Sequence, residues 1–154
     1  MKLSDLLMEE CIKMKMVAGD KRAAIEELVD VLVTATGKGD REAIIEAVWN
    51  REELMSTGIG QGIAIPHAKT NAVGKLYAVF GKSEAGIDFA ALDNRPVHIF
   101  FLLVAPEDQS GPHVKALARI SRLLKHSYFR TALLEATSPS EVLTIIREEE
   151  LKNS

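Results

Sequence analysis

The sequence predicts a layered α/β domain, and three observations lead to this class. Helical patterns occupy both ends of the chain, and short apolar runs typical of strands lie between them. One of these runs, from Val97 to Val104, is apolar on both alternating sets of positions, as expected for a strand covered on both faces. The chain has 154 residues, of which 47% are hydrophobic and 27% charged, an ordinary globular balance. We therefore expect residues 1–154 to form one domain in which helices and strands pack in layers.

The N-terminal third contains one short strand pattern and two helix starts. Ile12, Met14 and Met16 alternate with lysines, which predicts a strand. Asp20 and Asp40 can each cap a helix, because an aspartate side chain accepts a hydrogen bond from a free N–H group of the first turn. The inward faces would carry Ile25, Leu28, Val29 and Leu32 in the first helix, and Ala43, Ile44, Ala47 and Val48 in the second.

The middle of the chain favours strands. Residues 63–65, 76–81 and 97–104 are apolar runs of strand length. The pair Asp93-Asn94 precedes the last of them and is typical of a turn. We expect these runs to form the central sheet.

The C-terminal third favours helices. Ser110-Gly111-Pro112 begins one, with proline in the first turn, and Ser127 can cap another. Ser138-Pro139-Ser140-Glu141 matches a capping box with proline at the first helical position, the clearest helix start in the chain.

Composition and charge exclude several classes of function. The net charge is −3 and the pI about 5.8, so no basic surface is expected to bind nucleic acid. Cys11 is the only cysteine, which excludes a disulfide framework within one chain. No apolar segment resembles a signal peptide, and the run from Ile99 to Ala105 is too short to span a bilayer. We expect a cytoplasmic protein that does not insert into a membrane.

The most distinctive segment is Ser56 to His67, which reads STGIGQGIAIPH. Three glycines in five positions precede an apolar run that ends in Pro66-His67. A histidine at the end of a buried strand, beside a flexible glycine turn, would have a fixed backbone and one side of its ring open. That geometry suits a histidine that reacts, although an ordinary histidine capping a strand would give the same pattern.

His113 is a second candidate because of its place on a helix. It falls in the first turn of the expected helix, on the same face as Leu117, Ile120 and Leu124. There it could contact an anion together with the free N–H groups of the helix N-terminus. Alternatively, it is a buried histidine whose hydrogen bonds are satisfied by a neighbour.

Arg51 is the third candidate, expected between the second helix and the glycines. Its guanidinium could bind a phosphate or carboxylate through two N–H groups, or form a salt bridge with Glu52, Glu53 or another acid. The other two histidines are interpreted as structural. His98 begins a buried strand, and His126 falls in the last turn of a helix, where a cation suits the dipole.

Nucleotide and metal motifs do not match. Gly58-x-Gly60 lacks the third glycine of the dinucleotide fingerprint because Ile63 stands there, and no Gly-Lys-Ser/Thr occurs. The histidines lack the His-x-x-x-His and Glu-x-x-His spacings of metal sites. We therefore expect no cofactor and no metal.

The residues resemble a known family, the fructose/mannitol class of IIA proteins. This class belongs to the bacterial phosphoenolpyruvate-dependent sugar phosphotransferase system and includes the nitrogen-regulatory IIA proteins. The resemblance covers nearly the whole chain, with alanine at position 68 where many relatives carry glycine. The matching segments are Arg51-Glu52, Ser56-Thr57-Gly58-Ile59-Gly60, Ala64-Ile65-Pro66-His67, Ile87-Asp88-Phe89, 97–106 and Gly111-Pro112-His113-x-x-x-Leu117.

The resemblance implies both a fold and an activity. The fold would be a three-layer α/β/α sandwich with a small mixed sheet, forming a single type 2 IIA domain over residues 1–154. His67 would be phosphorylated, and His113 and Arg51 would hold the phosphoryl oxygens. The protein would be a phosphotransferase that accepts a phosphoryl group from the phosphohistidine of the general phosphocarrier protein and passes it to a IIB component for sugar uptake. Alternatively, it would be a nitrogen-regulatory IIA protein that acts by phosphorylation-dependent protein binding.

Two other classes of function remain open. A binding module of the same fold could have lost phosphorylation, but the presence of both His67 and His113 argues against it. A metal-dependent hydrolase would need the carboxylate–histidine spacings that this chain lacks.

A phosphoryl relay must also bind its partner proteins briefly, through a modest and partly apolar surface. We expect Met55, Ile59, Ala68 and Val114 to contribute to that surface, with inward packing of Ile59 beneath the glycines as the alternative.

Overall fold

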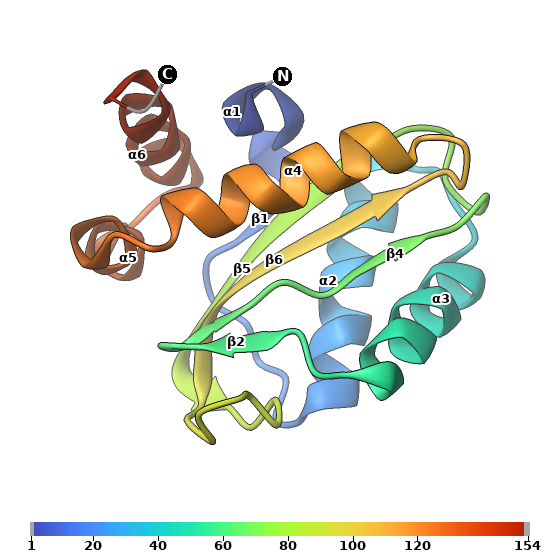
Figure 1. The fold of residues 1–154 in the computed structure, drawn as a ribbon, viewed down its shortest axis with the longest axis horizontal. Coiled ribbons are helices and arrows are strands. Elements are labelled where there is room, and N and C mark those ends of the chain that lie inside the picture. The colour runs from blue at the N-terminus through green and yellow to red at the C-terminus, as the bar shows by residue number, and fades with distance from the viewer. Residues whose placement is uncertain (1, 153–154) are drawn as a thin grey trace.

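A six-stranded mixed sheet lies between helices on both of its faces in the computed structural model, which describes residues 2–152 (Figure 1). This arrangement confirms the expected α/β/α fold. The helices are α1 (Leu3–Leu6), α2 (Lys21–Thr36), α3 (Arg41–Leu54), α4 (Ser110–Leu123), α5 (Ser127–Glu135) and α6 (Pro139–Lys152), with a 3₁₀ turn η1 (Glu9–Cys11). The strands are β1 (Ile12–Lys13), β2 (Gly58–Gly60), β3 (Ile63–Ala64), β4 (His67–Lys69), β5 (Tyr77–Ile87) and β6 (Val97–Ala105).

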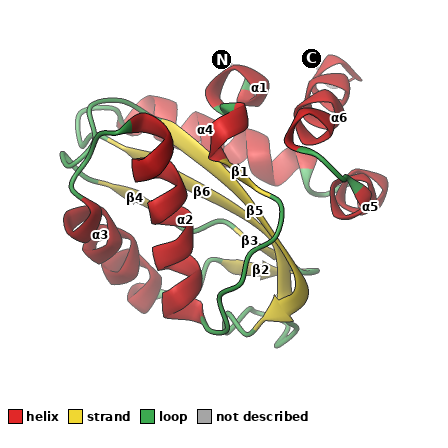
Figure 2. Ribbon diagram, turned by 180° about the vertical axis from the view of Figure 1, so that it is seen from behind, coloured by secondary structure: helices red, strands yellow, loops and turns green. Residues whose placement is uncertain are grey.

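The helices form two layers. Helix α4 lies over one face of the sheet in Figure 1, and α2 and α3 lie over the other face in Figure 2. Helix α6 packs against α1 and α5, so the two ends of the chain meet on one side of the molecule. None of the helices within residues 2–152 combines the length and apolar character that a bilayer span requires.

Strand β6 is the centre of the sheet. It pairs antiparallel with β5 on one side and parallel with β3 and then β4 on the other. Strand β1 lies beyond β5, and β2 lies beyond β3, so β1 and β4 occupy opposite edges. Because β3 and β4 follow each other along the same edge of β6, they form one interrupted line of strand, broken at residues 65–66.

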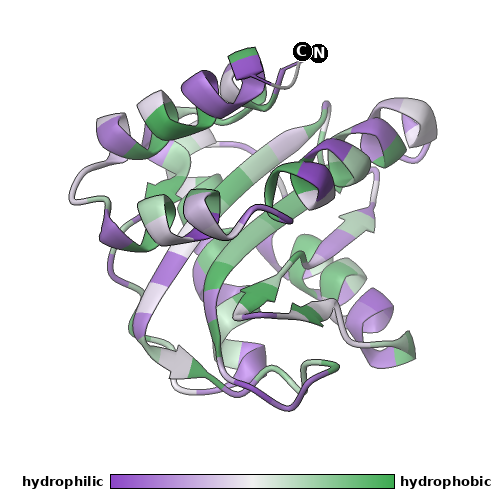
Figure 3. Cartoon of the chain, turned by 60° about the vertical axis from the view of Figure 1, so that its left-hand side comes forward, coloured by the Kyte–Doolittle hydropathy of each residue, from purple (hydrophilic) through white to green (hydrophobic). Residues whose placement is uncertain are grey.

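The core follows both faces of β6. Phe100 packs edge-on against Phe89, and its neighbour Phe101 packs edge-on against Phe80. Because successive side chains of a strand point to opposite faces, each face receives one aromatic pair. The expectation that residues 97–104 are covered on both faces is therefore confirmed. In Figure 3 the long central strands are largely green, whereas the helices alternate between green and purple, as expected for helices with one buried face.

The helix starts that depend on local sequence agree with the structure. Asp20 accepts a hydrogen bond from the N–H of Ala23 (2.8 Å), and Asp40 accepts one from Ala43 (3.2 Å). At α6 the hydroxyl of Ser138 accepts the N–H of Glu141 at 3.1 Å. The carboxylate of Glu141 accepts a hydrogen bond from the N–H of Thr137 (2.8 Å). In a standard capping box this bond would come from the N–H of the next residue, the N-cap Ser138.

Several expected boundaries are wrong. His126 does not lie in the last turn of a helix: α4 ends at Leu123, and His126 is the N-cap residue of α5, so Ser127 is the first residue of α5. Just beyond the end of α4, Arg130 donates to the carbonyls of Leu124 (2.7 Å) and Lys125 (3.0 Å). Strand β1 is shorter than expected, β5 is longer, and β2 and β4 were not expected at all.

Candidate active site

Strand β4 places His67 at the edge of the sheet. The carbonyl of Pro66 accepts the N–H of Leu103 at 3.0 Å, so the pairing with β6 continues across the proline. His67 then lies opposite Leu103 as the first residue of β4. The expected position at the end of a strand is therefore wrong, because His67 begins a strand of its own.

The side chain of His67 is oriented by a backbone carbonyl. Its Nδ1 lies 2.8 Å from the carbonyl oxygen of Ile65. A carbonyl oxygen can only accept, so Nδ1 carries the proton of this hydrogen bond. In the neutral imidazole Nε2 then has a free lone pair, which makes it the nucleophilic nitrogen.

The surroundings of His67 favour the neutral ring. Burial lowers the pKa of His67 below its usual value, and this is the largest influence. The hydrogen bond to Ile65 and the negative charge of Glu52 act in the opposite direction, whereas the positive charge of Arg51 lowers the pKa further. The net direction is downward, so the ring is neutral near pH 7.

His113 lies beside His67 on the first turn of α4. It is 4% exposed, and the centroids of the two rings are 5.5 Å apart. Its Nε2 is buried and has no hydrogen-bond partner among residues 2–152, so a fully satisfied core histidine does not describe it. Burial lowers the pKa of His113 to about 4, and the nearby His67 and Lys69 contribute in the same direction.

Arg51 lies in the last turn of α3, rather than after that helix as expected. Helix α3 packs against β4, and the charge of Arg51 acts on the His67 ring. The Nη1 of Arg51 donates to the carbonyl of Met55 at 2.9 Å. The ion pairs within residues 2–152 include none for Arg51, and the neighbouring Glu52 pairs with Lys21 instead. The alternative of a salt bridge with Glu52, Glu53 or another acid is therefore wrong.

Lys69 is a residue of this site that the sequence did not single out. It shares a face of β4 with His67, because side chains two positions apart on a strand point the same way. Its Nζ donates to the Oγ of Ser110 at the start of α4 (3.1 Å). The spacing of His67 and Lys69 would have identified it only if residues 67–69 had been recognised as a strand.

The glycines do not lie beside His67. Gly60, the last residue of β2, and the turn residues Gln61 and Gly62 all have positive φ angles (97°, 58° and 79°) in the β2–β3 hairpin. The carbonyl of Gly62 accepts the N–H of His98, five residues before the Leu103 that lies opposite His67. This spacing puts the turn roughly 15 Å from His67 along the sheet. The expectation of a glycine turn flanking His67 is wrong.

Three of the four expected contact residues are exposed. Met55, Ile59 and Val114 have exposed fractions of 63%, 45% and 61%, so inward packing of Ile59 is excluded. Ala68 is buried, because the alternation of β4 turns it away from the face that carries His67. Leu54, at the end of α3, is also exposed and was missed.

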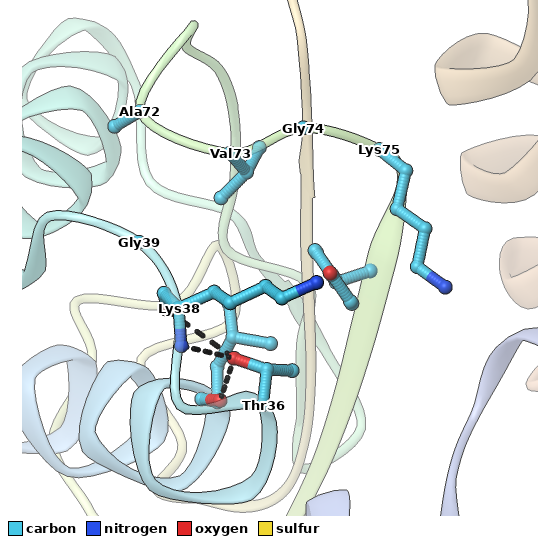
Figure 4. A pocket seen from close by; sticks show the side chains of 9 residues that line it. Thr36, Lys38, Gly39, Ala72, Val73, Gly74 and Lys75 are labelled. Carbon is cyan, nitrogen blue, oxygen red and sulfur yellow. Dashed lines mark hydrogen bonds between the residues drawn. The ribbon is translucent and has the colours of Figure 1, made fainter.

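Two hollows of the surface lie away from the three candidate residues. One of about 310 Å³ lies between the end of α2 and the segment after β4 (Figure 4). Figure 4 shows Lys38 reaching across it above Thr36, whose hydroxyl donates to the carbonyl of Leu32 (2.8 Å). A larger hollow of about 830 Å³ lies near Lys82. Neither hollow is lined by the three candidate residues. Within residues 2–152, no group of three His, Cys, Asp or Glu side chains is placed to hold a metal ion.

The fold and the site define a layered α/β protein with a neutral imidazole at the sheet edge, whose Nε2 has a free lone pair. The family model described as "Phosphoenolpyruvate-dependent sugar phosphotransferase system, EIIA 2" matches residues 5–149, and the chain belongs to this family. The resemblance seen in the sequence is thus confirmed. Membership implies phosphotransfer as the class of activity.

Relatives of two kinds are similar over most of the chain. The "PTS system fructose-specific EIIABC component" of Bacillus subtilis is 43% identical over 148 residues, covering 96% of this chain but 23% of that protein. The "PTS system fructose-specific EIIA component" of Haloferax volcanii is 40% identical, covering 90% of each chain. A "Nitrogen regulatory protein" of Klebsiella oxytoca is 34% identical, covering 96% of this chain and 91% of that protein.

Solved structures share the fold. The nitrogen regulatory protein IIA-Ntr from Neisseria meningitidis superposes with a TM-score of 0.83 at 29% identity, covering 94% of this chain and 98% of that chain. IIA mannitol from Escherichia coli superposes with a TM-score of 0.77 at 26% identity, covering 91% and 98%.

Proposed function

We propose that this protein is a phosphohistidine relay in which His67 is the acceptor. The lone pair of His67 Nε2 forms a bond to phosphorus while the N–P bond of the phosphocarrier's phosphohistidine breaks. The donor imidazole leaves with the electron pair of that bond. The proton on Nδ1 of His67 stays in its hydrogen bond to Ile65, so the phosphorylated ring carries positive charge and remains a reactive donor for the next step.

The observation that carries this proposal is the contact between His67 Nδ1 and the Ile65 carbonyl. It leaves Nε2 with its lone pair and without the proton that would prevent attack. The lowered pKa of His67 keeps the ring in this neutral form near pH 7. No proton transfer is needed before attack.

His113 and Arg51 are proposed to hold the phosphoryl oxygens. Charge spreads over three oxygens during transfer, and donors aimed at them stabilise the transition state. Arg51 offers a planar set of N–H groups and has no competing ion pair within residues 2–152. His113 is neutral in the free protein, but a phosphoryl dianion beside it favours protonation, and the unpartnered Nε2 could then donate.

A IIB component for fructose is the proposed acceptor. The relatives of B. subtilis and H. volcanii are named fructose-specific, and they support this choice of sugar. A solved complex of E. coli IIA mannitol with phosphorylated IIB mannitol has the same fold, with a TM-score of 0.79 at 24% identity. In that complex a IIA protein and its IIB partner bind each other directly.

A regulatory role is the second candidate. It is favoured by the similarity to proteins named nitrogen regulatory protein over nearly their whole length. In this role phosphorylation of His67 would control binding to a regulated protein, and transfer to a IIB component would be absent.

Reconstitution tests the relay. The protein is incubated with labelled phosphoenolpyruvate, the first enzyme of the system and the phosphocarrier, and a fructose IIB component is then added. Acid-labile label on His67 that moves to IIB supports the transport role. Label that forms on His67 but stays there in the presence of IIB supports the regulatory role. A protein that takes up no label contradicts both.

A further inference from the structure

A buried carboxylate lies behind the reactive histidine. Glu52, in the last turn of α3, is 2% exposed. Three donors converge on it: the N–H of Thr57 (2.8 Å), the hydroxyl of Thr57, and the ammonium of Lys21 (2.9 Å). The ion pair with Lys21 balances the charge, which makes a buried carboxylate tolerable.

Thr57 connects this carboxylate to the segment that holds His67. The carbonyl of Thr57 accepts the N–H of Ile65 at 3.0 Å, which extends the β2–β3 pairing by one step. The carbonyl of Ile65 in turn accepts the Nδ1 proton of His67. Pro66 restricts Ile65 to extended backbone and is itself held by Leu103. The Ile65 carbonyl is therefore fixed from both sides.

Only a carboxylate fits the position of Glu52. All of its partners are donors, and a carboxylate consists entirely of acceptors. A glutamine amide would offer one oxygen and would turn an NH₂ group toward another donor. The hydrogen bonds of Thr57 would then loosen, and with them the placement of Ile65.

We propose that Glu52 is a positioning residue for phosphoryl transfer. It acts through Thr57 and Ile65 to keep the proton of His67 on Nδ1, so that Nε2 stays unprotonated. This role rests on the proposed function of His67 as the acceptor. It gives the buried carboxylate of Glu52, whose charge Lys21 balances, a role beyond stability. Partners that orient a metal-binding histidine typically contribute about 10–100-fold, and we expect an effect of this order here.

The test compares Glu52→Gln with a matched control. Glu27→Gln removes another carboxylate that accepts backbone N–H groups, those of Val17 and Ala18 (both at 3.0 Å), but it does so beside β1 at the opposite edge of the sheet. Thr57→Val is a second, milder variant, because it removes the hydroxyl donor and keeps the N–H bond. Each folded variant is measured for its melting temperature, the nitrogen NMR shifts of His67 and the rate of transfer from the phosphocarrier.

The expected result for Glu52→Gln is a mixture of tautomers. The Nδ1 and Nε2 shifts of His67 should move toward each other, and the transfer rate should fall by about 10–100-fold. Thr57→Val should change the His67 nitrogen shifts and the transfer rate in the same direction by a smaller amount. If Glu52→Gln does not fold, the result for Thr57→Val tests the proposal instead. Glu27→Gln should lower the melting temperature and leave both quantities unchanged.

The proposal is wrong if the folded variants keep the wild-type shifts and rate, because Glu52 would then only stabilise the fold. It is also wrong if Glu27→Gln changes the shifts and rate as much as Glu52→Gln does. A wild-type protein that accepts no label would instead contradict the proposed function. The tautomer comparison would still show whether Glu52 controls His67, so the two failures are distinguishable.

Discussion

The rings of His67 and His113 lie 5.5 Å apart, one on the edge strand β4 and the other in the first turn of α4. The proximity of His67 contributes to the lowered pKa of His113, whose Nε2 has no partner in the described chain. A buried polar atom without a partner costs free energy. An incoming anionic group would give that atom a partner, and the first three predictions follow from this pair and its neighbour Arg51.

Replacing His113 should slow transfer without unfolding the protein. His113→Ala removes the imidazole and with it the donor. Loss of one donor to a developing anion costs roughly 2.7–4 kcal/mol in comparable sites, which corresponds to a fall of about 10²–10³ in single-turnover rate. Ser121→Ala, on the same helix, is the control. A wild-type rate in folded His113→Ala would leave His113 with a structural role only.

Acid should destabilise the protein through His113. Its pKa is about 4 when folded and near 6.5 when unfolded, so the unfolded chain binds more protons between these values. The contribution of this group to the free energy of unfolding is therefore complete above pH 6.5 and declines as the pH falls toward 4. The decline amounts to about 3 kcal/mol. Denaturant unfolding at several pH values should show this slope in the wild type, and a His113→Gln variant with the same slope would contradict the assignment.

Arg51→Ala should also slow transfer, by about 10²–10³. Arg51→Lys should recover little of the loss, because an ammonium is a point charge and cannot donate to two phosphoryl oxygens in a fixed plane. Asn50→Ala, one residue earlier on α3, controls for changes in the helix. Equal rates for the lysine variant and the wild type would show that charge alone suffices at this position.

Local interactions explain what the sequence predicted well. The caps at Asp20 and Asp40 each join a side chain to an N–H group three residues later, so the relevant partners are visible in the sequence itself. The inward position of His113 followed from helical periodicity in the same way. The segment that ends in His67 stands out by its order of residues and by its resemblance to a family, not by geometry.

Non-local pairing explains what the sequence missed. Strand β4 has three residues and follows a proline, so it has no periodic signal of its own and exists because β6 pairs with it. This strand explains three differences from the expectations: His67 lies in a strand, Ala68 is buried, and Lys69 belongs to the site. The glycine turn was misplaced for a related reason, since closeness in sequence does not give distance along a sheet.

Exposed apolar residues of α4 and of the sheet edge that carries β2 and β4 predict where a partner binds. Val114 follows His113 on α4 and is largely exposed, so a charge there should obstruct docking and leave the fold intact. We expect Val114→Glu and Ile59→Glu each to slow transfer from the phosphocarrier with little change in melting temperature.

Val17→Glu is the matched control for this surface. Val17 is also an exposed valine, but it follows β1 at the opposite edge of the sheet from β4. The Val17→Glu variant should accept the phosphoryl group from the phosphocarrier at the wild-type rate. An equal slowing by all three substitutions would point to charge in general rather than to a contact surface around His67.

The most direct test of the relay is to locate the phosphoryl group after incubation with the phosphorylated phosphocarrier. Mass spectrometry under alkaline conditions should find it on His67 of the wild type and of His126→Gln, a control that removes a histidine at the start of α5. His67→Gln should fold, as judged by its melting curve, and should carry no label. A phosphoryl group on any other residue of the wild type, or acid-labile label on folded His67→Gln, would contradict the assignment of His67 as the acceptor.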